Sequence, residues 1–600
     1  MRSRHYLDKN HQTRVPRSMC WVDTEALNED GKPEAGRQTL FFGCAIYERY
    51  SQRDQFHCSY SDRLLFYNAS DFWKWIDSKT YKGRSLYIFA HNWNYDGAIL
   101  NTTNELPKLG WTLKSYINEK PPVIIKWVKG SSTIHMVDTL NYFQNSVAEL
   151  GRSVGMAKLD MPSGGVHSEE WADYAWRDVE IIRKAVLGLR EFIHKHDMGN
   201  FQFTSASQAF SAYRHRFMKH KILVHDHEKG LKLERESYHG GRAEAFWKGP
   251  ATRKMYKLDI NSMYPSIMKK YPLGVHFEAY FPFYVDSWWK RVWGSHSIVA
   301  SCDIETEEDC YPYHLDGKLV FPVGKFTTTL TTPEIEYGLK MGHIVGINEW
   351  AYHKREYIFT EWVDYLYTLR KEYKTEGNDV FAYFVKLLMN SCYGKFGQQN
   401  KNWEDTHNHY MDDDVSYAYE MDDDGTFHKL RNILGNVQIL GKESESRNSV
   451  PLIAAEITAY ARMYLWEIMK QAGDGNVYYC DTDSVIVNRS GYNNLKDYLD
   501  TEELGYLKVE EEATSAIFEA PKDYTFGTTT KIKGVKKNAT KIDYNHYIQD
   551  RFGSWHVMIV NNEEGYVDVL PIHKHITHLN TKRRVLGNGY TLPIRLPLQD

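Results

Sequence analysis

Three aspartates, one near the middle of the chain and two far downstream, are spaced as divalent-metal ligands for phosphoryl transfer. Asp259 ends a strand-like run, while Asp481 and Asp483 lie between the apolar runs 477–480 and 485–487. The second pattern predicts a hairpin that holds both carboxylates at its tip. Mg²⁺ prefers carboxylate oxygens, and a pair of metal ions can activate both the attacking and the leaving oxygen. We therefore expect these three carboxylates to converge on a two-metal site.

A predicted helix pair supplies cations for a nucleoside triphosphate. Helical patterns over 360–374 and 379–396 are separated by the turn-rich segment 375–378, which predicts an antiparallel arrangement. Each helix carries polar side chains at i, i+4 or i+7, so they share a face. These side chains are Arg370, Lys374, Lys386, Asn390 and Tyr393. For Lys374 an ordinary exposed helix charge is the alternative interpretation.

Four carboxylates in the first third form a second candidate metal site. Asp23 and Glu25 lie two residues apart in a predicted strand, so their side chains share one face. Asp96 follows an apolar strand, and Asp178 lies four residues after Tyr174 on a helix predicted from apolar spacings of three and four. Four carboxylates again suit two metal ions.

The segments around the first set resemble the polymerase motifs of family B DNA polymerases. DINSMYPSIM, KLLMNSCYGKFG and YCDTDS occur in the order of that family. Tyr238, Gly240 and Gly241 in YHGG are similar to the YxGG motif of the protein-primed branch from bacteriophages and linear plasmids. Lys522 and Tyr524 are similar to its KxY motif. The branch also carries two terminal-protein regions, and two spans between the motifs are long enough to be these insertions.

The resemblance implies a role for each matching residue. Asp259 and Asp483 would be the main metal ligands with Asp481 beside them, and Tyr264 would exclude a ribose 2′-OH. The triphosphate would be held by Arg370, Lys374 and Lys386. The base-pair pocket would be shaped by Asn390 and Tyr393. The primer terminus would be steadied by Lys522 and Tyr524, and the template would be contacted by Tyr238, Gly240 and Gly241.

The second set of carboxylates is similar to the three exonuclease motifs of proofreading polymerases, in the same order. The resemblance implies that the metals would be bound by Asp23, Glu25, Asp96 and Asp178. Tyr174 would orient the attacking water, and the 3′ end of single-stranded DNA would be contacted by Asn92 and Tyr95. Lys158 matches an additional lysine of this branch. Ala26 stands where relatives often carry a threonine that touches the primer strand, so the resemblance leaves the grip on the substrate at this position open.

The predicted fold is α/β and multidomain: an RNase H-like 3′–5′ exonuclease domain followed by a right-hand polymerase of palm, fingers and thumb. The expected divisions are a polar leader (1–18), exonuclease (19–197), first palm part (198–274), first insertion (275–357), fingers (358–397), second insertion (398–448), second palm part (449–525) and thumb (526–600).

Charge is distributed unevenly along a chain whose overall balance is neutral to acidic. The net charge of −4 excludes a global basic footprint, so nucleic-acid contacts must come from local patches. Residues 521–541 hold six lysines against one acid, which suits phosphate contact. Residues 402–425 hold nine acids and no Lys or Arg, which indicates a solvated insertion. The histidines at 573, 575 and 578 are expected on the thumb surface rather than as metal ligands.

Seven cysteines without a CxxC pair favour free thiols in a reducing compartment, and no segment is apolar enough to span a membrane. We expect a monomeric, cytoplasmic polymerase of a virus or linear plasmid that uses Mg²⁺, with Mn²⁺ able to substitute. Its partners would be primer-template DNA, single-stranded DNA, dNTPs and a terminal protein as primer. The alternatives are a family B polymerase that extends ordinary primers, an exonuclease with an inert polymerase half, and a DNA-binding scaffold without chemistry.

Overall fold

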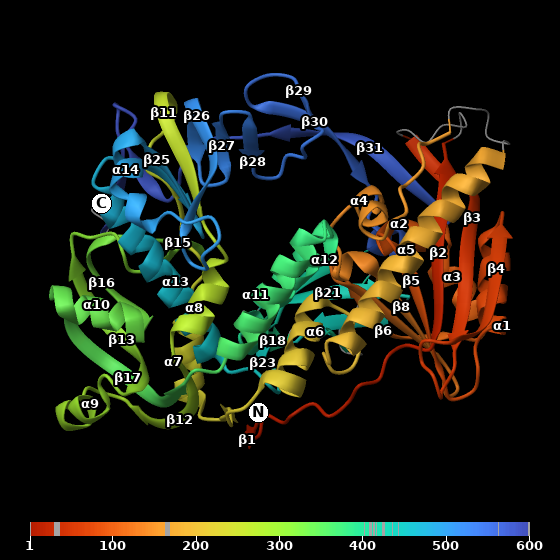
Figure 1. Ribbon diagram of the computed structural model, residues 1–600, viewed down its shortest axis with the longest axis horizontal. Helices are drawn as coiled ribbons and strands as arrows, with labels where there is room; N and C mark the ends of the chain where they lie inside the picture. The colour runs from red at the N-terminus through yellow and green to blue at the C-terminus, as the bar shows by residue number, and fades with distance from the viewer. Residues whose placement is uncertain are drawn as a thin grey trace.

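The computed structural model describes most of the chain (Figure 1). The described residues are all except 1, 29–35, 120, 163–168, 401–402, 407–410, 412–414, 416, 423–426, 435, 442, 562 and 598–600. Much of the acidic run predicted within 402–425 therefore lies outside the described residues. Among the described residues no helix is both long and apolar enough to cross a membrane. All seven cysteines are free.

A ten-stranded sheet, at the right of Figure 1, contains the exonuclease motifs. Its order is β29-β30-β31-β3-β2-β5-β8-β7-β6, with β4 also paired to β3. Its strands are β2 (Ser18–Leu27), β3 (Gly36–Tyr50), β4 (Cys58–Phe66), β5 (Ser85–Ala90), β6 (Thr112–Asn118), β7 (Val123–Lys129), β8 (Ser132–Asp138), β29 (Thr540–Lys541), β30 (His546–Phe552) and β31 (Tyr566–His575).

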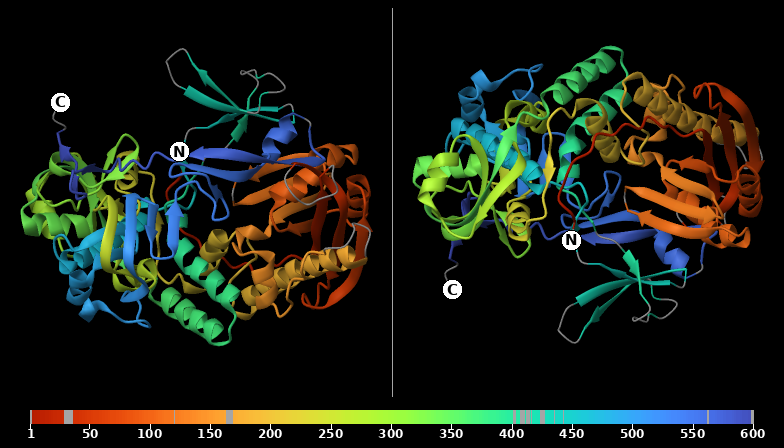
Figure 2. Two further views of the ribbon diagram at one scale, coloured as in Figure 1. Left: turned by 90° about the horizontal axis from the view of Figure 1, so that it is seen from above. Right: turned by 90° about the horizontal axis from the view of Figure 1, so that it is seen from below.

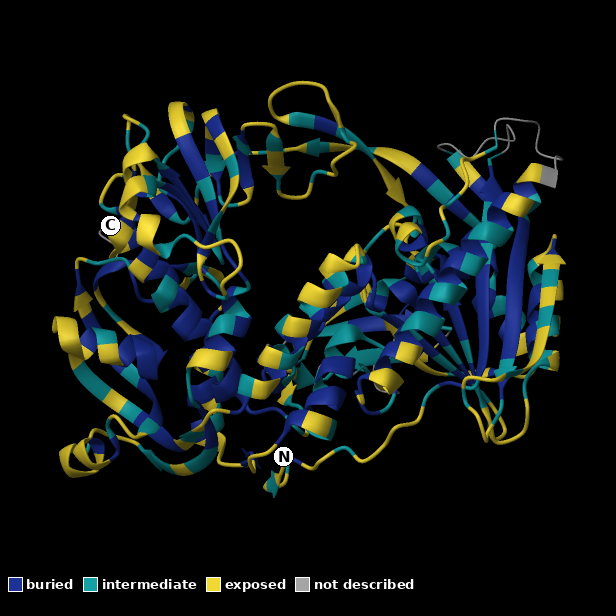
Figure 3. Cartoon of the chain, in the orientation of Figure 1, coloured by how far each residue is buried: buried dark blue, intermediate teal, exposed yellow. Residues whose placement is uncertain are grey.

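The period-two alternation of β2 explains why both faces of this sheet are covered by helices. Met19 and Trp21 point into the core beneath α5 (Glu169–Lys195), whereas Cys20 and Val22 join the core beneath α1 (Ala69–Ser78). The central strands are accordingly buried in Figure 3. Continuing the same alternation, Asp23 belongs to the face of β2 that α5 covers.

The C-terminal segment joins this sheet, which the predicted division into separate domains does not show. Residues 566–569 of β31 pair antiparallel with residues 36–39 of β3. In Figure 1 strands β30 and β31 extend across the top of the molecule toward the second large sheet. The expectation that His578 lies on the thumb surface is wrong. Its ring is 8% exposed, and its Nδ1 lies 2.6 Å from Asp523 Oδ2.

A seven-stranded sheet, ordered β10-β24-β25-β11-β26-β27-β28, carries the polymerase aspartates. Its strands are β10 (Ala243–Ala245), β11 (Gly249–Ile260), β24 (Val477–Asp481), β25 (Ser484–Asn488), β26 (Leu507–Ala520), β27 (Asp523–Phe526) and β28 (Thr529–Ile532). The apolar helix α13 (Pro451–Ala472) is buried along most of its length. It also contacts α8 (Met263–Lys270), which begins just after the aspartate of β11.

The predicted helix pair is confirmed as α11 (Thr360–Thr375) and α12 (Asp379–Phe396), which pack against each other. Gly377 adopts a φ of 71° in the connecting turn, a conformation that favours glycine. The Asn378 side chain then caps α12 by accepting a hydrogen bond from the Phe381 amide.

Two smaller sheets lie largely within the predicted insertions, and one short strand of the first sheet comes from the C-terminal segment. The first is ordered β12-β17-β13-β16-β34 and consists of β12 (Leu273–Phe281), β13 (His296–Thr306), β16 (Val323–Thr331), β17 (Ile344–Glu356) and β34 (Arg595–Leu596). The second is ordered β19-β22-β21-β20 and consists of β19 (Trp403–Asp405), β20 (Tyr417–Met421), β21 (Phe427–Ile433) and β22 (Asn436–Leu440). In Figure 2 this second sheet, drawn in teal, projects away from the rest of the molecule.

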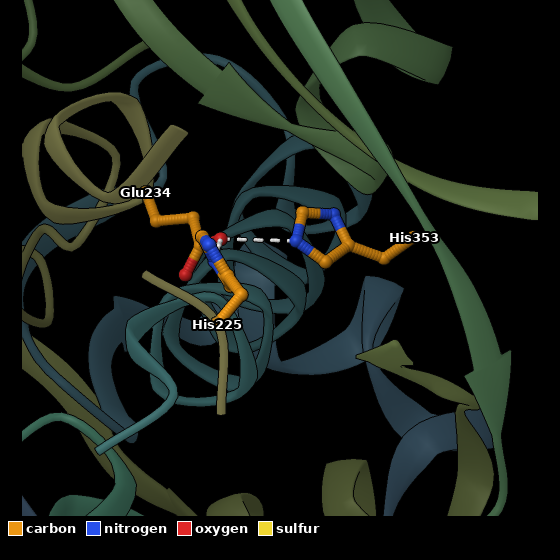
Figure 4. Close-up of side chains that lie close together, drawn as sticks. All are labelled: His225, Glu234 and His353. Carbon is orange, nitrogen blue, oxygen red and sulfur yellow. Dashed lines mark hydrogen bonds and ion pairs between the residues drawn. The ribbon is translucent and has the colours of Figure 1, made fainter. Parts of the chain in front are cut away.

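A buried polar cluster ties residues 225–234 to β17 (Figure 4). Glu234 lies on α7 (Glu228–Glu236), and its Oε1 is 2.6 Å from His225 Nε2 and 2.9 Å from His353 Nε2. A carboxylate only accepts, so both Nε2 atoms carry protons and donate them. Burial alone would raise the pKa of Glu234, but the two imidazoles hold it below its usual value. Because both Nε2 atoms carry a proton, neither has a free lone pair, and the cluster is held together by hydrogen bonds.

A buried carboxyl on α13 makes stability depend on pH. Burial raises the pKa of Glu456 to about 7, although the Gly274 amide and the Thr332 hydroxyl donate to its side chain. The folded state therefore holds this proton more tightly than the unfolded state. Its stabilising contribution is complete below the unfolded pKa of 4.5 and is lost as the pH rises through about 7.

Glu456→Gln should remove this loss, because the amide stays neutral at every pH. The raised pKa corresponds to about 3 kcal/mol between the two limits. We expect the melting temperature of the variant, relative to wild type, to rise from about pH 4.5 to about pH 7 and to level off above that, as followed by circular dichroism. A difference that does not vary with pH would show that Glu456 is ionised throughout.

Candidate active sites

The strand register brings the three polymerase aspartates to one end of the seven-stranded sheet. Asp259 on β11 and Asp481 on β24 both lie opposite Ser484, the first residue of the intervening β25. Asp483 precedes that residue, and its carbonyl accepts a hydrogen bond of 2.7 Å from the Ile260 amide. The predicted hairpin therefore places all three residues side by side.

Electrostatics mark this end of the sheet as a site for cations. Burial and the neighbouring Asp259 raise the pKa of Asp483 to about 6, with Lys386 opposing the shift. Burial and Glu510 likewise raise the pKa of Asp259, against the effect of Lys508. The negative charges of these half-buried carboxylates repel one another, and a bound divalent cation would remove that repulsion. The donor set therefore fits Mg²⁺ or Mn²⁺.

Lys508 belongs to this site although sequence reasoning missed it. It lies opposite Asp259 in the β11–β26 pair, and its Nζ is 3.3 Å from Asp259 Oδ2. Lys522, which was predicted, has its Nζ 3.9 Å from Asp481 Oδ1. No local motif distinguishes Lys508, because its position depends on a long-range strand pairing.

The YHGG segment holds the turn between Asp481 and Asp483. Thr482, the central residue, has a φ of 60°, and its amide donates a 2.6 Å hydrogen bond to the Arg242 carbonyl. A Cβ on Gly241 would lie only 2.9 Å from the Thr482 side chain, so this glycine is required by packing. A Cβ on Gly240 would meet nothing within 4 Å, so packing does not explain that glycine.

Helices α11 and α12 direct their cations toward the same aspartates. Arg370 Nη1 donates to Ser262 Oγ at 3.0 Å, and burial lowers the pKa of Arg370. Lys374 is exposed, and partial desolvation together with the nearby cations Arg370 and Lys508 lowers its pKa, so its role at the triphosphate stays a prediction. Cations gathered this closely form a preorganised site for an anion such as a triphosphate.

Aromatic rings and a buried side-chain amide oxygen lie next to these cations. Tyr264 stacks on Tyr393, with ring centroids 5.2 Å apart and planes at 26°. The Asn390 Oδ1 is buried without a hydrogen-bond partner in the described part of the chain. Tyr238 lies close to Gly397, at the end of α12, where a Cβ would be 2.6 Å from its ring.

The KxY segment packs beside the aspartate hairpin. The Lys522 amide donates a 2.8 Å hydrogen bond to the Tyr479 hydroxyl on β24. The Tyr524 ring centroid lies 4.7 Å from that of Tyr479. Both predicted primer-terminus residues are therefore anchored to the strand that ends in Asp481.

The second site forms between β2, α2 (Trp93–Ile99) and α5. Carboxylate oxygens of Asp23, Glu25 and Asp178 all lie within 4.8 Å of one another. Asp96 joins them through Thr24 Oγ1, which donates to its Oδ1 at 2.7 Å. The four predicted carboxylates are thus brought together.

Burial and mutual repulsion disfavour the charged forms of these carboxylates. Burial, followed by Asp178, raises the pKa of Glu25 to about 8, and burial raises the pKa of Asp96 to about 7. Burial and the other three acids raise the pKa of Asp23. The Asp178 Oδ1 is buried without a hydrogen-bond partner among the described residues. An open donor atom and crowded carboxylates fit divalent metal ions.

Lys158 and Tyr174 complete this site. The Lys158 ammonium forms an ion pair with Asp178 and lies 4.3 Å from the centroid of the Tyr174 ring. Ala26, at the position where the family often has threonine, is buried.

A cavity of about 310 Å³ adjoins the second site. Asn92 and Tyr95 line it, and so do Arg551 and Phe552 from the C-terminal segment. The Phe552 ring meets Tyr95 edge-on at 6.1 Å. Sequence reasoning could not find the C-terminal contributors, because only the pairing of β31 with β3 brings them here.

A larger cavity of about 730 Å³ lies where the N-terminal segment meets the end of α12. Its charged lining residues are all cations or histidine: Lys9, His11, Arg214, Lys395 and Arg447. No carboxylate lines it among the described residues, so the cavity suits a polyanion despite the net negative charge of the chain.

Comparisons with known proteins converge on one family. The family described as DNA polymerase type B, organellar and viral, matches residues 165–471. A probable DNA polymerase of Ascobolus immersus is 29% identical over 440 residues, covering 68% of this chain and 34% of the relative. The DNA polymerase of Bacillus phage phi29 is 22% identical over 464 residues, covering 70% and 74%. The chain thus spans about a third of the length of that fungal relative.

A solved structure supports the fold independently. Phi29 DNA polymerase in a ternary complex with primer-template DNA and incoming nucleotide aligns with a TM-score of 0.68 at 17% identity. The alignment covers 94% of this chain and all of the phage chain. The predicted fold class, an exonuclease domain followed by a right-hand polymerase, is confirmed.

Proposed function

We propose, because this chain belongs to the type B DNA polymerases of organelles and viruses, that it is a DNA-directed DNA polymerase with a proofreading 3′–5′ exonuclease. One observation carries the proposal: the Asp259, Asp481 and Asp483 carboxylates share one sheet end with converging cations of the fingers. That arrangement provides for both metal ions and a triphosphate, which a scaffold without chemistry does not need.

In the forward reaction the primer 3′-OH attacks the α-phosphorus of the dNTP, forming a phosphodiester and releasing pyrophosphate. Metal ions held by Asp259, Asp481 and Asp483 would lower the pKa of the attacking hydroxyl and stabilise charge on the leaving group. Arg370, Lys374 and Lys386 neutralise the triphosphate, as the resemblance implies. Asn390 and Tyr393 shape the base-pair pocket, while Lys522 and Tyr524 steady the primer terminus. Tyr238, Gly240 and Gly241 contact the template.

In the editing reaction water attacks the terminal phosphodiester and releases a deoxynucleoside monophosphate. Asp23, Glu25, Asp96 and Asp178 hold the metals of this site, and Tyr174 orients the water. Asn92 and Tyr95 bind the 3′ end, supported by the cavity that they line. We propose Mg²⁺ for both sites, with Mn²⁺ as a substitute.

We further propose that a terminal protein supplies the first hydroxyl and that the enzyme displaces the non-template strand unaided. The YxGG and KxY motifs and the two inserted sheets support this proposal. The predicted division into leader, exonuclease, palm, fingers, thumb and two insertions remains our proposed domain assignment, with β31 shared by the exonuclease sheet.

The function is tested with a 5′-labelled primer annealed to a longer template in the presence of Mg²⁺. With dNTPs the primer should lengthen, and without them it should shorten from its 3′ end. Shortening without any extension would identify a nuclease with an inert polymerase half. Extension of a DNA primer alone, with no transfer to candidate terminal proteins, would favour the ordinary-primer alternative.

Tyr264→Ala should relax discrimination between deoxyribonucleotides and ribonucleotides. The Tyr264 ring stacks on Tyr393 beside the aspartates, so its loss opens space where a 2′-OH would clash. We expect the ratio of kcat/KM for dNTP over rNTP to fall by about tenfold or more. Tyr264→Phe keeps the ring and should retain discrimination. An unchanged ratio in the alanine variant would remove Tyr264 from this role.

A further inference from the structure

Behind the polymerase aspartates lies a buried network of four charged side chains that the proposed mechanism does not use. Glu244 lies on β10 and Arg242 directly precedes that strand, while Asp309 lies in the first insertion and Arg583 on β32 (Arg583–Val585) of the C-terminal segment. The Arg242 and Glu244 side chains are 1% and 0% exposed, and that of Arg583 is 5% exposed. The Asp309 side chain is 15% exposed, so three segments far apart in sequence meet in a largely buried environment.

The four charges balance and contact one another closely. Glu244 accepts from Arg242 Nε at 2.6 Å, and its other oxygen is 3.3 Å from Arg583 Nη1. Asp309 Oδ2 accepts from Arg583 Nη1 at 2.6 Å and lies 3.2 Å from Arg242 Nη2. Buried charges are tolerated only when paired, so each member holds the others in place.

One hydrogen bond connects this network to the turn between Asp481 and Asp483. Strand β10 pairs with β24, so that Ala243 faces Asp481 and Glu244 faces Cys480. The carbonyl of Arg242 accepts the Thr482 amide proton at 2.6 Å, and Thr482 has the unfavourable φ of 60°. The network therefore fixes the side chains of Arg242 and Glu244, and the backbone of this same segment shapes the Asp481–Asp483 turn.

The C-terminal segment closes the network and covers the edge of the sheet. Strand β32 pairs with β33 (Thr591–Pro593), and the Thr591 amide donates to the Phe246 carbonyl at 3.0 Å, just beyond β10. Arg583 Nε donates to Thr591 Oγ1 at 2.9 Å. Since β10 is the edge strand, this hairpin and its arginine are what hold that edge against movement.

We propose that Arg583 is a positioning residue for polymerisation: through Glu244, Asp309 and Arg242 it holds the turn that presents Asp481 and Asp483. Its side chain contacts Glu244, Asp309 and Thr591, and it acts on the Asp481–Asp483 turn through the backbone of Arg242. The inference rests on the proposed function for its effect on rate. Its structural part, the rigidity of the turn, does not depend on any activity.

The test compares Arg583→Met with Arg595→Met. Arg595 forms an ion pair with Glu307, so it also joins the C-terminal segment to the first insertion, but both partners are at least half exposed. Hydrogen–deuterium exchange of the Thr482 amide is the first readout, measured without metal or substrate. We expect exchange about tenfold faster or more in Arg583→Met and unchanged exchange in Arg595→Met.

Kinetics provide the second readout. In Arg583→Met the kcat for extension should fall about tenfold and the Mg²⁺ concentration for half-maximal extension should rise, while KM for dNTP changes by less than about twofold. Shortening of single-stranded DNA should stay at the wild-type rate, because the exonuclease aspartates lie on another sheet. A parallel fall of both activities, or unchanged Thr482 exchange, would overturn the proposal.

A neutral double variant, Glu244→Gln with Arg583→Met, covers the case in which the single variant fails to fold. It removes one charge of each sign and leaves Arg242 paired with Asp309. We expect it to fold and still to show fast Thr482 exchange; wild-type exchange would refute the positioning role. If wild type itself does not extend primers while the exchange result holds, the proposed function fails and the structural inference stands.

Discussion

Asp483→Asn should abolish primer extension and leave 3′ shortening intact. The amide keeps the size of the side chain but removes the charge from a residue whose pKa is raised by burial and Asp259. Loss of one metal ligand charge costs the transition state about 4 kcal/mol, which corresponds to about a thousandfold in rate. Single-turnover extension of a labelled primer, with the exonuclease rate measured in parallel, gives both numbers.

The matched control is Asp474→Asn. Asp474 is exposed and lies in the loop just before β24. It is therefore close to this strand in sequence but away from the end of the sheet that carries the three aspartates. It should extend primers at the wild-type rate. If Asp483→Asn retained more than about a tenth of wild-type extension, Asp483 would not be a main metal ligand.

Asp23→Asn should produce the opposite phenotype, a polymerase that cannot shorten its primer. Asp23 lies with Glu25 and Asp178 in a cluster whose carboxylate oxygens are within 4.8 Å of one another. Removing one charge weakens metal binding by the whole cluster, so excision should fall by about a hundredfold to a thousandfold. Release of the labelled 3′ nucleotide from single-stranded DNA measures this rate.

Asp173→Asn is the control for this site, since Asp173 is exposed on α5 one residue before Tyr174. Its excision rate should equal that of wild type. A strong defect in Asp173→Asn would indicate that α5 as a whole, rather than the cluster, governs excision. Residual fast excision in Asp23→Asn would leave the cluster without its proposed role.

The carboxylates could be predicted because their signals are local. The alternation of β2 places Asp23 and Glu25 on one face, and the hairpin between 477 and 488 places Asp481 and Asp483 at its tip. Helix periodicity likewise predicted α11 and α12 to within one residue at each end. Each of these patterns spans fewer than about twenty residues, a length over which periodicity is informative.

The missed features all depend on contacts between distant segments. Lys508 reaches Asp259 only because β26 pairs with β11, and Phe552 reaches Tyr95 only because β31 extends the exonuclease sheet. The buried position of His578 likewise requires its contact with Asp523. Register between strands that are hundreds of residues apart is set by packing of the whole chain, which single-sequence patterns do not encode.

Our proposal places polymerisation and editing in one chain at two separate sites. Its most direct test is the conversion of labelled dNTP to dNMP on a primer-template that allows only one addition. Wild type should add the nucleotide, excise it and repeat, so that dNMP accumulates far beyond the amount of primer. Asp483→Asn and Asp23→Asn should each stop this turnover. Continued dNMP formation by either variant would contradict the assignment of two distinct sites.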